Sequence, residues 1–230
     1  MPTQDHRVKN EKRTLAAVIP ALNAAAMLPR TLAALGDIEA VVVDGGSRDG
    51  TAAVARTCGV RVVAAPRGRG EQIASGVGAT RSAWLLLLHA DTVLAPGWAG
   101  VAQAHMAAGE GRAAYFRFAL DSADPRARRL ERAVAWRCRA LALPYGDQGL
   151  LVSRALLDAV GGVRPLPLME DVDLVRRIGR ARLVALPVDA LTSAARWERD
   201  GWWRRSARNL VCLSLWFAGV PPRVIARLYG

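Results

Sequence analysis

Cysteine is scarce in this sequence, with three among 230 residues. Cys58, Cys138 and Cys212 are odd in number and far apart, which argues against a disulfide framework and against the usual spacings of a zinc site. Unpaired thiols are typical of a reducing compartment, so we expect a cytoplasmic protein.

Long hydrophobic runs are also missing. The longest apolar stretch, residues 210–220, is interrupted by Ser214 and Gly219 and is too short to cross a bilayer. Residues 1–14 are polar and charged, so we expect no signal peptide there. The sequence therefore predicts no membrane-spanning segment.

Acidic residues are fewer than basic ones, 20 against 32, which gives a net charge of +12. Nearly all the basic residues are arginine, since only Lys9 and Lys12 are lysine. Such a charge suits an anionic partner: a nucleic acid, a phosphorylated small molecule or an acidic membrane surface. An apolar fraction of 52% excludes a disordered chain, and the length is enough for one sizeable core.

Signatures of three other enzyme classes are absent. The segment Gly68-Arg69-Gly70 has Ile73 where a dinucleotide fingerprint needs its third glycine, which argues against a Rossmann oxidoreductase. The sequence has no GxxxxGK[ST] loop, which argues against a P-loop ATPase, and no GxSxG nucleophile elbow.

The first half of the chain alternates short β-type runs with helical patterns. This rhythm predicts an α/β fold with a doubly wound, mostly parallel sheet and helices on both faces. The expected strands are 15–20, 38–43, 60–64 and 84–88, and the expected helices are 27–35, 49–57, 69–80 and 97–108.

The second half mixes both patterns less regularly. After a polar segment (1–14), we expect a domain over 15–200, with a nucleotide-binding half (15–110) and an acceptor half (111–200), and then a basic amphipathic helical tail (201–230). The expected strands here are 113–120, 149–153 and 183–186, and the expected helices are 125–143, 154–160, 169–178, 202–218 and 221–228.

Polar residues follow each of the first four expected strands. In a doubly wound sheet, ligands bind beyond the carboxyl ends of the strands, so we expect a ligand site there. The alternative is that these loops are polar only because they are solvated. The polar residues are Asn23 after the first strand, Asp44 and Ser47 after the second, Arg67 after the third, and His89 and Asp91 after the fourth. Pro20, the last residue of the first strand, and Gly46 belong to the same expected site.

Four segments carry recognisable motifs: the strand and loop at 18–23, VVVDGGSRDGT at 41–51, His-Ala-Asp at 89–91, and MEDVDL at 169–174. Over residues 15–200 they resemble family-2 glycosyltransferases of the GT-A fold, which have DDGSxDGT, a metal-binding DxD and a late ED motif.

A smaller subfamily shares further segments with this chain. They are Tyr-Gly-Asp-Gln-Gly at 145–149, Leu-Pro-Leu-Met-Glu-Asp at 166–171 and Arg-Trp-Glu at 196–198. These segments resemble transferases associated with radical-SAM and selenodomain proteins and with arsenosugar biosynthesis.

The resemblance implies an inverting transfer of a sugar from a UDP-linked nucleotide-diphospho-sugar to the hydroxyl of a small-molecule or lipid-linked acceptor. It implies Asp171 as general base, with Glu170 beside it, and Asp91 as a ligand of Mg²⁺ or Mn²⁺. His89 departs from the family, which has an acidic residue there. We expect it to contact the ribose or a phosphate of the nucleotide instead, and the alternative is a hydrogen bond at the strand end. The alternative for Glu170 and Asp171 is an acidic first helical turn favoured by the macrodipole.

The resemblance assigns further binding roles. Asp44 would accept hydrogen bonds from the nucleoside, and Pro20 and Asn23 would shape the loop against the base. Gly46 and Ser47 would also bind the nucleotide, and the planar guanidinium of Arg67 would pair with a phosphate. Asp147 and Gln148 would contact the donor sugar or the acceptor, and Trp197 would stack on a sugar face. The alternatives are a solvated loop charge for Arg67 and interior packing for Trp197.

The tail combines arginines, tryptophans and an apolar helix face. This combination predicts peripheral association with an acidic membrane surface, at the inner face of the cytoplasmic membrane. The alternative is a surface helix that packs its apolar side on the core.

Two other functions are weighed against the transferase. A sugar-1-phosphate nucleotidyltransferase carries a glycine-rich, lysine-bearing loop after its first strand, where this chain has Pro20-Ala21-Leu22-Asn23. A nucleic-acid-binding domain would show a helix-turn-helix or an aromatic-bearing sheet. Neither is evident, so we expect no nucleic-acid partner.

Overall fold

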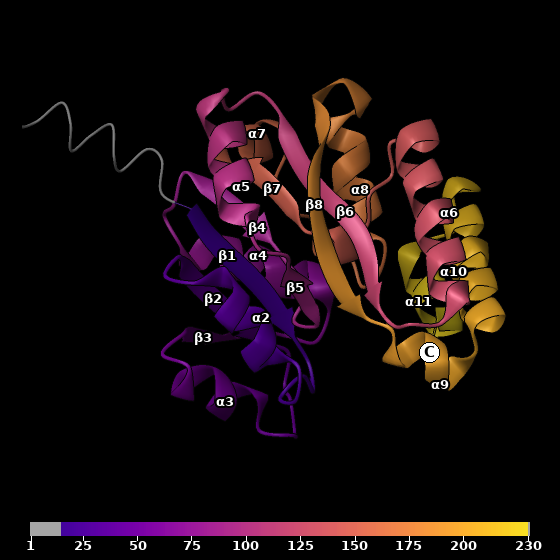
Figure 1. Ribbon diagram of the computed structural model, residues 1–230, viewed down its shortest axis with the longest axis horizontal. Coiled ribbons are helices and arrows are strands. Elements are labelled where there is room, and N and C mark those ends of the chain that lie inside the picture. The colour runs from indigo at the N-terminus through magenta and orange to yellow at the C-terminus, as the bar shows by residue number, and fades with distance from the viewer. Residues whose placement is uncertain (1–14, 230) are drawn as a thin grey trace, which may run out of the picture.

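The computed structural model describes residues 15–229, so the predicted polar segment 1–14 lies outside the described residues. Its centre is an eight-stranded sheet of order β3-β2-β1-β4-β7-β6-β8-β5 (Figure 1). The strands are β1 (Leu15–Ala21), β2 (Glu39–Asp44), β3 (Arg61–Ala64), β4 (Trp84–Leu87), β5 (Thr92–Leu94), β6 (Ala113–Asp121), β7 (Leu150–Ser153) and β8 (Leu183–Ser193).

Helices cover both faces of the sheet, as predicted. Side chains of β1 alternate between two core clusters, with Val18 facing α4 and α8 and Ile19 facing α2 and α5. Full burial on both faces explains the continuous apolar runs of the parallel strands. The helices are α2 (Leu28–Leu35), α3 (Thr51–Thr57), α4 (Arg69–Ala79), α5 (Trp98–Ala107), α6 (Pro125–Leu141), α7 (Arg154–Ala159), α8 (Glu170–Ile178), α9 (Ala195–Asp200), α10 (Trp202–Phe217) and α11 (Pro222–Tyr229), with 3₁₀ turns η1 (Gly146–Gln148) and η2 (Arg180–Arg182).

Strands β1 to β4 are parallel to one another, and β6 and β8 form a second parallel pair. Ala21 is paired with Asp44, and Val18 is paired with Leu87, so the carboxyl ends of β1, β2 and β4 meet at one edge. The loops that carry the predicted ligand residues therefore start from the same edge. This confirms the parallel arrangement expected from the sequence.

The second half of the sheet departs from the expectation in two places. β8 continues beyond residue 186 to Ser193, and β5 was not expected at all. Pro187 suggests a strand end, but it falls in a register shift, where Tyr115 pairs with Ala185 and Arg117 pairs with Asp189. A proline is tolerated in such an irregularity because no ladder hydrogen bond is needed from it.

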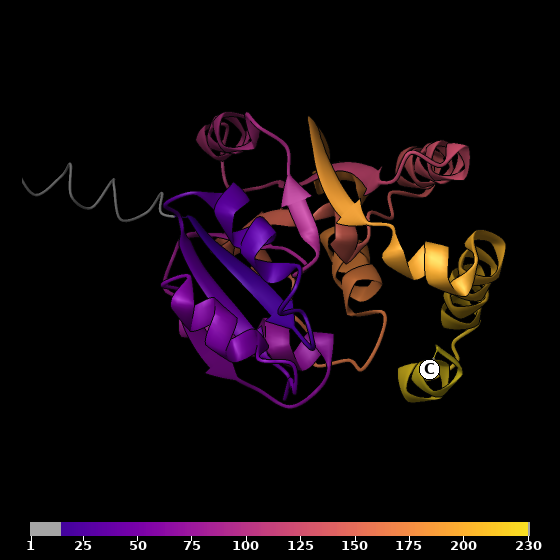
Figure 2. The same cartoon turned by 60° about the horizontal axis from the view of Figure 1, so that its bottom comes forward.

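The C-terminal helices pack on the domain. Cys212, Leu213 and Ile225 belong to the same core cluster as α4 and α8, and Trp202 packs with residues of α6. Both views place α10 and α11 on the side of α6, away from β1–β3 (Figures 1 and 2). Within residues 15–229, no helix has the length and apolar character needed to cross a membrane.

Candidate active site

The loops after β1 and β2 are tied together by the residues predicted to bind a nucleotide. The Asn23 backbone N–H donates to Ser47 Oγ at 2.9 Å, and the Arg48 N–H donates to Asn23 Oδ1 at 2.9 Å. The Ser47 N–H donates to Asp44 Oδ2 at 3.2 Å. Gly46 has a φ of 86°, a left-handed conformation that favours glycine.

Gln72 of α4, which no sequence motif singles out, supports this loop pair from inside the domain. Its amide Nε2 donates to Ala21 O and to Val43 O, both at 2.8 Å, and its side chain is buried. A Cβ atom on Gly45 would lie 3.0 Å from the Gln72 side chain. Arg67, in the loop between β3 and α4, is exposed.

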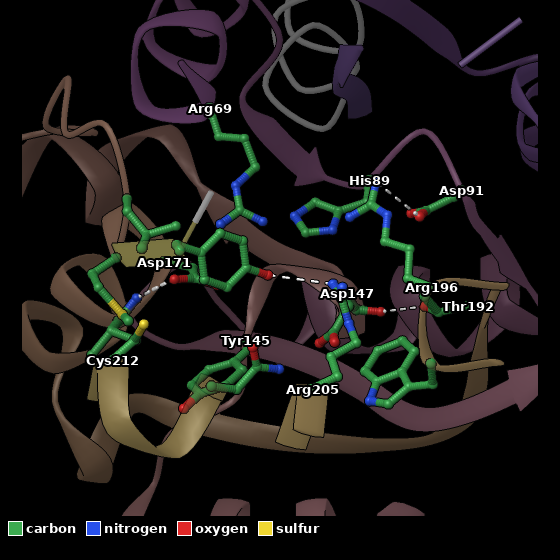
Figure 3. Close-up of a pocket in the computed structure, with 16 residues that line it drawn as sticks. Arg69, His89, Asp91, Tyr145, Asp147, Asp171, Thr192, Arg196, Arg205 and Cys212 are labelled. Carbon is green, nitrogen blue, oxygen red and sulfur yellow. Dashed lines mark hydrogen bonds and ion pairs between the residues drawn. The ribbon is translucent and has the colours of Figure 1, made fainter. Parts of the chain in front are cut away.

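A pocket of about 90 Å³ lies between the sheet edge and the C-terminal helices (Figure 3). His89, Asp91, Asp147, Asp171 and Trp197, which come from distant parts of the sequence, all line it. Residues not predicted for the site also line it, including Arg69, Tyr145, Thr192, Arg196, Arg205, Asn209 and Tyr229. The cluster of Asn23, Asp44 and Ser47 does not line this pocket.

Asp171 is fixed in the first turn of α8. Its Oδ2 accepts a hydrogen bond from the Gly146 N–H at 2.9 Å, and its Oδ1 accepts one from the Val172 N–H at 2.8 Å. Each carboxylate oxygen has a second lone pair, so one can still accept a proton. Asp171 and Asp91 stand on opposite sides of the pocket in Figure 3.

Glu170 lies behind Asp171. Its side chain is 1% exposed and forms an ion pair with Arg69, whose Nε is 2.8 Å from Oε1. Burial raises the pKa of Glu170, and the Arg69 charge opposes the rise. Glu170 lines a smaller cavity of about 30 Å³, together with Pro20, His89 and Asp171.

His89 and Asp91 follow β4. Asp91 forms an ion pair with Arg196, at 3.6 Å between Oδ2 and Nη2. Burial and the nearby Arg69 charge lower the pKa of His89, so its ring is neutral at pH 7. A Cβ atom on Gly146 would lie 2.5 Å from His89 Nε2, so glycine at 146 lets the ring reach the pocket.

Asp147 extends a carboxylate into the pocket. Burial raises the pKa of Asp147 to about 6, and the charges of Asp171 and Asp91 add to the rise while Arg137 opposes it. Its Oδ1 is buried without a hydrogen-bond partner among residues 15–229. Such an oxygen is costly unless a ligand or a cation satisfies it.

Gln148 and Trp197, both predicted sugar contacts, are placed differently. Gln148 is 2% exposed and does not line the pocket; its Nε2 donates to Phe116 O at 3.0 Å and its Oε1 accepts from the Tyr145 N–H at 3.3 Å. Trp197 is 7% exposed and packs edge-on against Phe118, with centroids 6.3 Å apart, but it also lines the pocket. Gln148 therefore supports the surrounding backbone, and Trp197 both packs in the core and reaches the pocket.

The family model of glycosyl transferase family 2 matches residues 16–162. The chain belongs to glycosyltransferase family 2. This membership favours the transferase over the nucleotidyltransferase and nucleic-acid-binding alternatives. The comparison with curated proteins gives no match.

Solved structures of glycosyltransferases share the fold. Glucosyl-3-phosphoglycerate synthase from Mycobacterium tuberculosis in complex with Mn²⁺ and UDP-glucose superposes with a TM-score of 0.64 at 21% identity, covering 94% of this chain and 83% of that one. The same enzyme with Mg²⁺ and UDP gives 0.63 at 21% identity, covering 94% and 84%. Its complex with phosphoglyceric acid gives 0.63 at 20% identity, covering 96% and 86%.

Proposed function

We propose that this glycosyltransferase moves a sugar from a UDP-linked donor to an acceptor hydroxyl with inversion, assisted by Mg²⁺ or Mn²⁺. The observation that carries the proposal is one pocket in which Asp91, from the nucleotide half, faces Asp171, from the acceptor half. The similar synthase bound to Mn²⁺ and UDP-glucose supports the choice of donor. The link to the radical-SAM-associated subfamily stays a prediction.

The pocket fits a divalent cation held by few protein ligands. Mg²⁺ is commonly held by one or two carboxylates together with substrate phosphates. Asp91 offers one carboxylate, and the unpartnered Oδ1 of Asp147 offers another oxygen in the same pocket. In the described part of the chain, no cluster of three or more His, Cys, Asp or Glu residues could hold a metal. A cation at Asp91 would neutralise the charge that develops on the leaving diphosphate.

Residues of the protein supply the general base and the nucleoside-binding loops. Asp171, held by the Gly146 and Val172 N–H groups, accepts the proton of the attacking hydroxyl. The loops of Asn23 and Asp44 hold the nucleoside. A cation at Asp91 would compete with Arg196, whose Nη2 lies 3.6 Å from Asp91 Oδ2, for the Asp91 charge.

The donor class can be tested by measuring melting temperatures with Mn²⁺ and UDP, GDP, dTDP or CDP sugars. We expect UDP sugars to stabilise the protein most, because a ligand that binds only the folded state raises its stability. The same screen in EDTA should lose most of this shift. A larger shift with another nucleotide, or none with any, would refute the proposed donor.

The tail also supports peripheral membrane association, which we include in the proposal. Trp203 is 74% exposed, Leu210 63% and Phe217 51%, and their spacing places them on one face of α10. Residues 201–230 contain five arginines and no acidic residue. This combination suits an anionic lipid surface and a lipid-linked acceptor.

Point variants can test membrane association without removing the tail, whose other face is buried. Wild-type protein should float with vesicles that contain phosphatidylglycerol, and Trp203→Ser/Leu210→Ser should float markedly less. Equal recovery of the two proteins would reject the association.

A further inference from the structure

A second cavity of about 510 Å³ lies beside the pocket, between α9, the first turns of α10 and the end of α11. It shares Arg196, Arg205 and Tyr229 with the 90 Å³ pocket of Asp91 and Asp171, which we call the catalytic pocket, so the two spaces adjoin. We call it the arginine pocket because its charged lining residues are Arg196, Arg199, Arg204, Arg205, Arg208 and Asp200.

The arginine pocket has a large surplus of positive charge. Asp200 is its single acidic lining residue, and it pairs with Arg199 at 2.8 Å, Arg205 at 2.9 Å and Arg208 at 3.5 Å. Five guanidinium groups against one carboxylate leave a net charge of +4. Because like charges repel, such a cluster is stabilised when an anion enters it.

Buried N–H donors without partners line the wall between the two pockets. Arg205 is 6% exposed, and its Nε has no hydrogen-bond partner among the described residues. Trp197 Nε1 and Arg208 Nε also have no hydrogen-bond partner among the described residues. Trp197 lines the catalytic pocket, and Arg208 lines the arginine pocket. Unpartnered donors on this wall call for a ligand that supplies acceptors, and phosphate oxygens are strong acceptors for guanidinium groups.

The nucleoside diphosphate of the donor does not explain this cavity. The predicted nucleotide loops start at the ends of β1 and β2, and neither loop lines the arginine pocket. The arginine pocket is built instead by the C-terminal helices, beyond Trp197 and Arg196. A ligand spanning both spaces could reach Asp171 with one end and the arginines with the other.

We propose that the arginine pocket binds a phosphate group of the acceptor and thereby aims an acceptor hydroxyl at Asp171. The substrate class is an organic phosphate that carries a free hydroxyl, either soluble or attached to a lipid. The proposal rests on the proposed function, since it assigns the acceptor side of the same transfer.

Binding of a phosphate probe tests this site separately from the donor. Glycerol 3-phosphate is titrated calorimetrically into protein saturated with UDP and Mn²⁺, so the donor's diphosphate position is filled. We compare Arg199→Gln/Arg204→Gln, which changes two exposed arginines of the pocket, with Arg223→Gln/Arg227→Gln, which removes the same charge from exposed positions of α11. Arg208→Gln serves as a second pocket variant.

We expect wild type and the α11 variant to bind glycerol 3-phosphate alike, and both pocket variants to bind at least tenfold more weakly. Equal weakening in the pocket and α11 variants would show only a general charge effect and would overturn the proposal. Repeating the binding measurement with vesicles that contain phosphatidic acid or phosphatidylcholine distinguishes a lipid phosphate from a soluble one. Pocket-dependent binding to phosphatidic acid alone assigns the phosphate to a lipid, and no pocket-dependent binding to either probe overturns the site.

The same titrations distinguish failure of the proposed donor from failure of the proposed acceptor site. If UDP and Mn²⁺ do not bind, the proposed function is refuted, and glycerol 3-phosphate titrated without them still reports on the arginine pocket. If UDP binds but the phosphate probes do not, only the acceptor inference fails.

Discussion

Replacing Arg69 by Gln should destabilise the protein through the buried charge of Glu170. The Glu170 side chain is 1% exposed, and Arg69 Nε lies 2.8 Å from its carboxylate. Removing one partner of a fully buried ion pair typically costs about 3–5 kcal/mol, because the other charge is left uncompensated. The Arg69 side chain is 34% exposed, so water already weakens this pair and we expect a loss near the lower end of that range. The double variant Arg69→Gln/Glu170→Gln removes that charge as well and should recover most of the loss.

The penalty should also depend on pH. Burial raises the pKa of Glu170 in the folded state, and loss of Arg69 removes the charge that opposes the rise. The folded variant then binds a proton at a pH where the unfolded chain does not, so its stability increases as pH falls. We therefore expect the penalty of Arg69→Gln to be large at pH 8 and smaller at pH 5.

Urea unfolding of the wild type, Arg69→Gln and the double variant at both pH values measures these differences. Arg81→Gln is a matched control, because Arg81 is exposed just beyond α4 and should change stability by less than about 0.5 kcal/mol. A loss below about 1 kcal/mol for Arg69→Gln at pH 8, or no recovery in the double variant, would refute the reasoning.

Two further predictions concern packing and pH. Gly76→Ala should lower the free energy of unfolding, measured in urea, by about 1–3 kcal/mol, because the new Cβ atom would lie 2.8 Å from Val43 Cγ2. Gly78→Ala in the same helix is the control, because its Cβ atom would meet nothing within 4 Å and should not destabilise the protein. A similar loss in both would contradict this. Asp147→Asn should stabilise the cation-free protein at pH 8 by up to about 3 kcal/mol. The pKa of Asp147 is raised to about 6 in the folded state, so the folded protein holds this proton more tightly than the unfolded chain does. The wild type therefore loses stability as pH rises through that value, whereas the Asn variant does not. The gain should vanish at pH 4, and a gain that persists there would disprove the assignment.

Most of the fold could be predicted because its strands are strongly patterned. The central residues of β1, β2 and β4 are buried on both faces, which gives uninterrupted apolar runs. β5 escaped prediction because it has three residues, and its pairing with β8 depends on contacts distant in sequence. Pro187 hid the second half of β8, since the register shift that accommodates it is a property of the paired strands.

The site was predictable to a smaller extent. Asp91 and Asp171 were found through motifs, and both line the pocket. Arg69, Arg196 and Arg205 line the same pocket, but the chain has so many arginines that sequence alone does not single these out. Gln148 lies inside a motif-like segment, yet its side chain points into the core because it satisfies buried backbone groups there.

The central claim is that Asp91 holds the cation of a UDP-binding site while Asp171 serves the chemistry. The most direct measurement is calorimetric UDP affinity, in Mn²⁺ and in EDTA, for wild type, Asp91→Asn, Asp171→Asn and the exposed control Asp37→Asn. We predict that Mn²⁺ strengthens UDP binding in all of them except Asp91→Asn, and that Asp171→Asn binds UDP like wild type. UDP affinity that is unaffected by Mn²⁺ in wild type, or equally strengthened by Mn²⁺ in Asp91→Asn, would contradict the account.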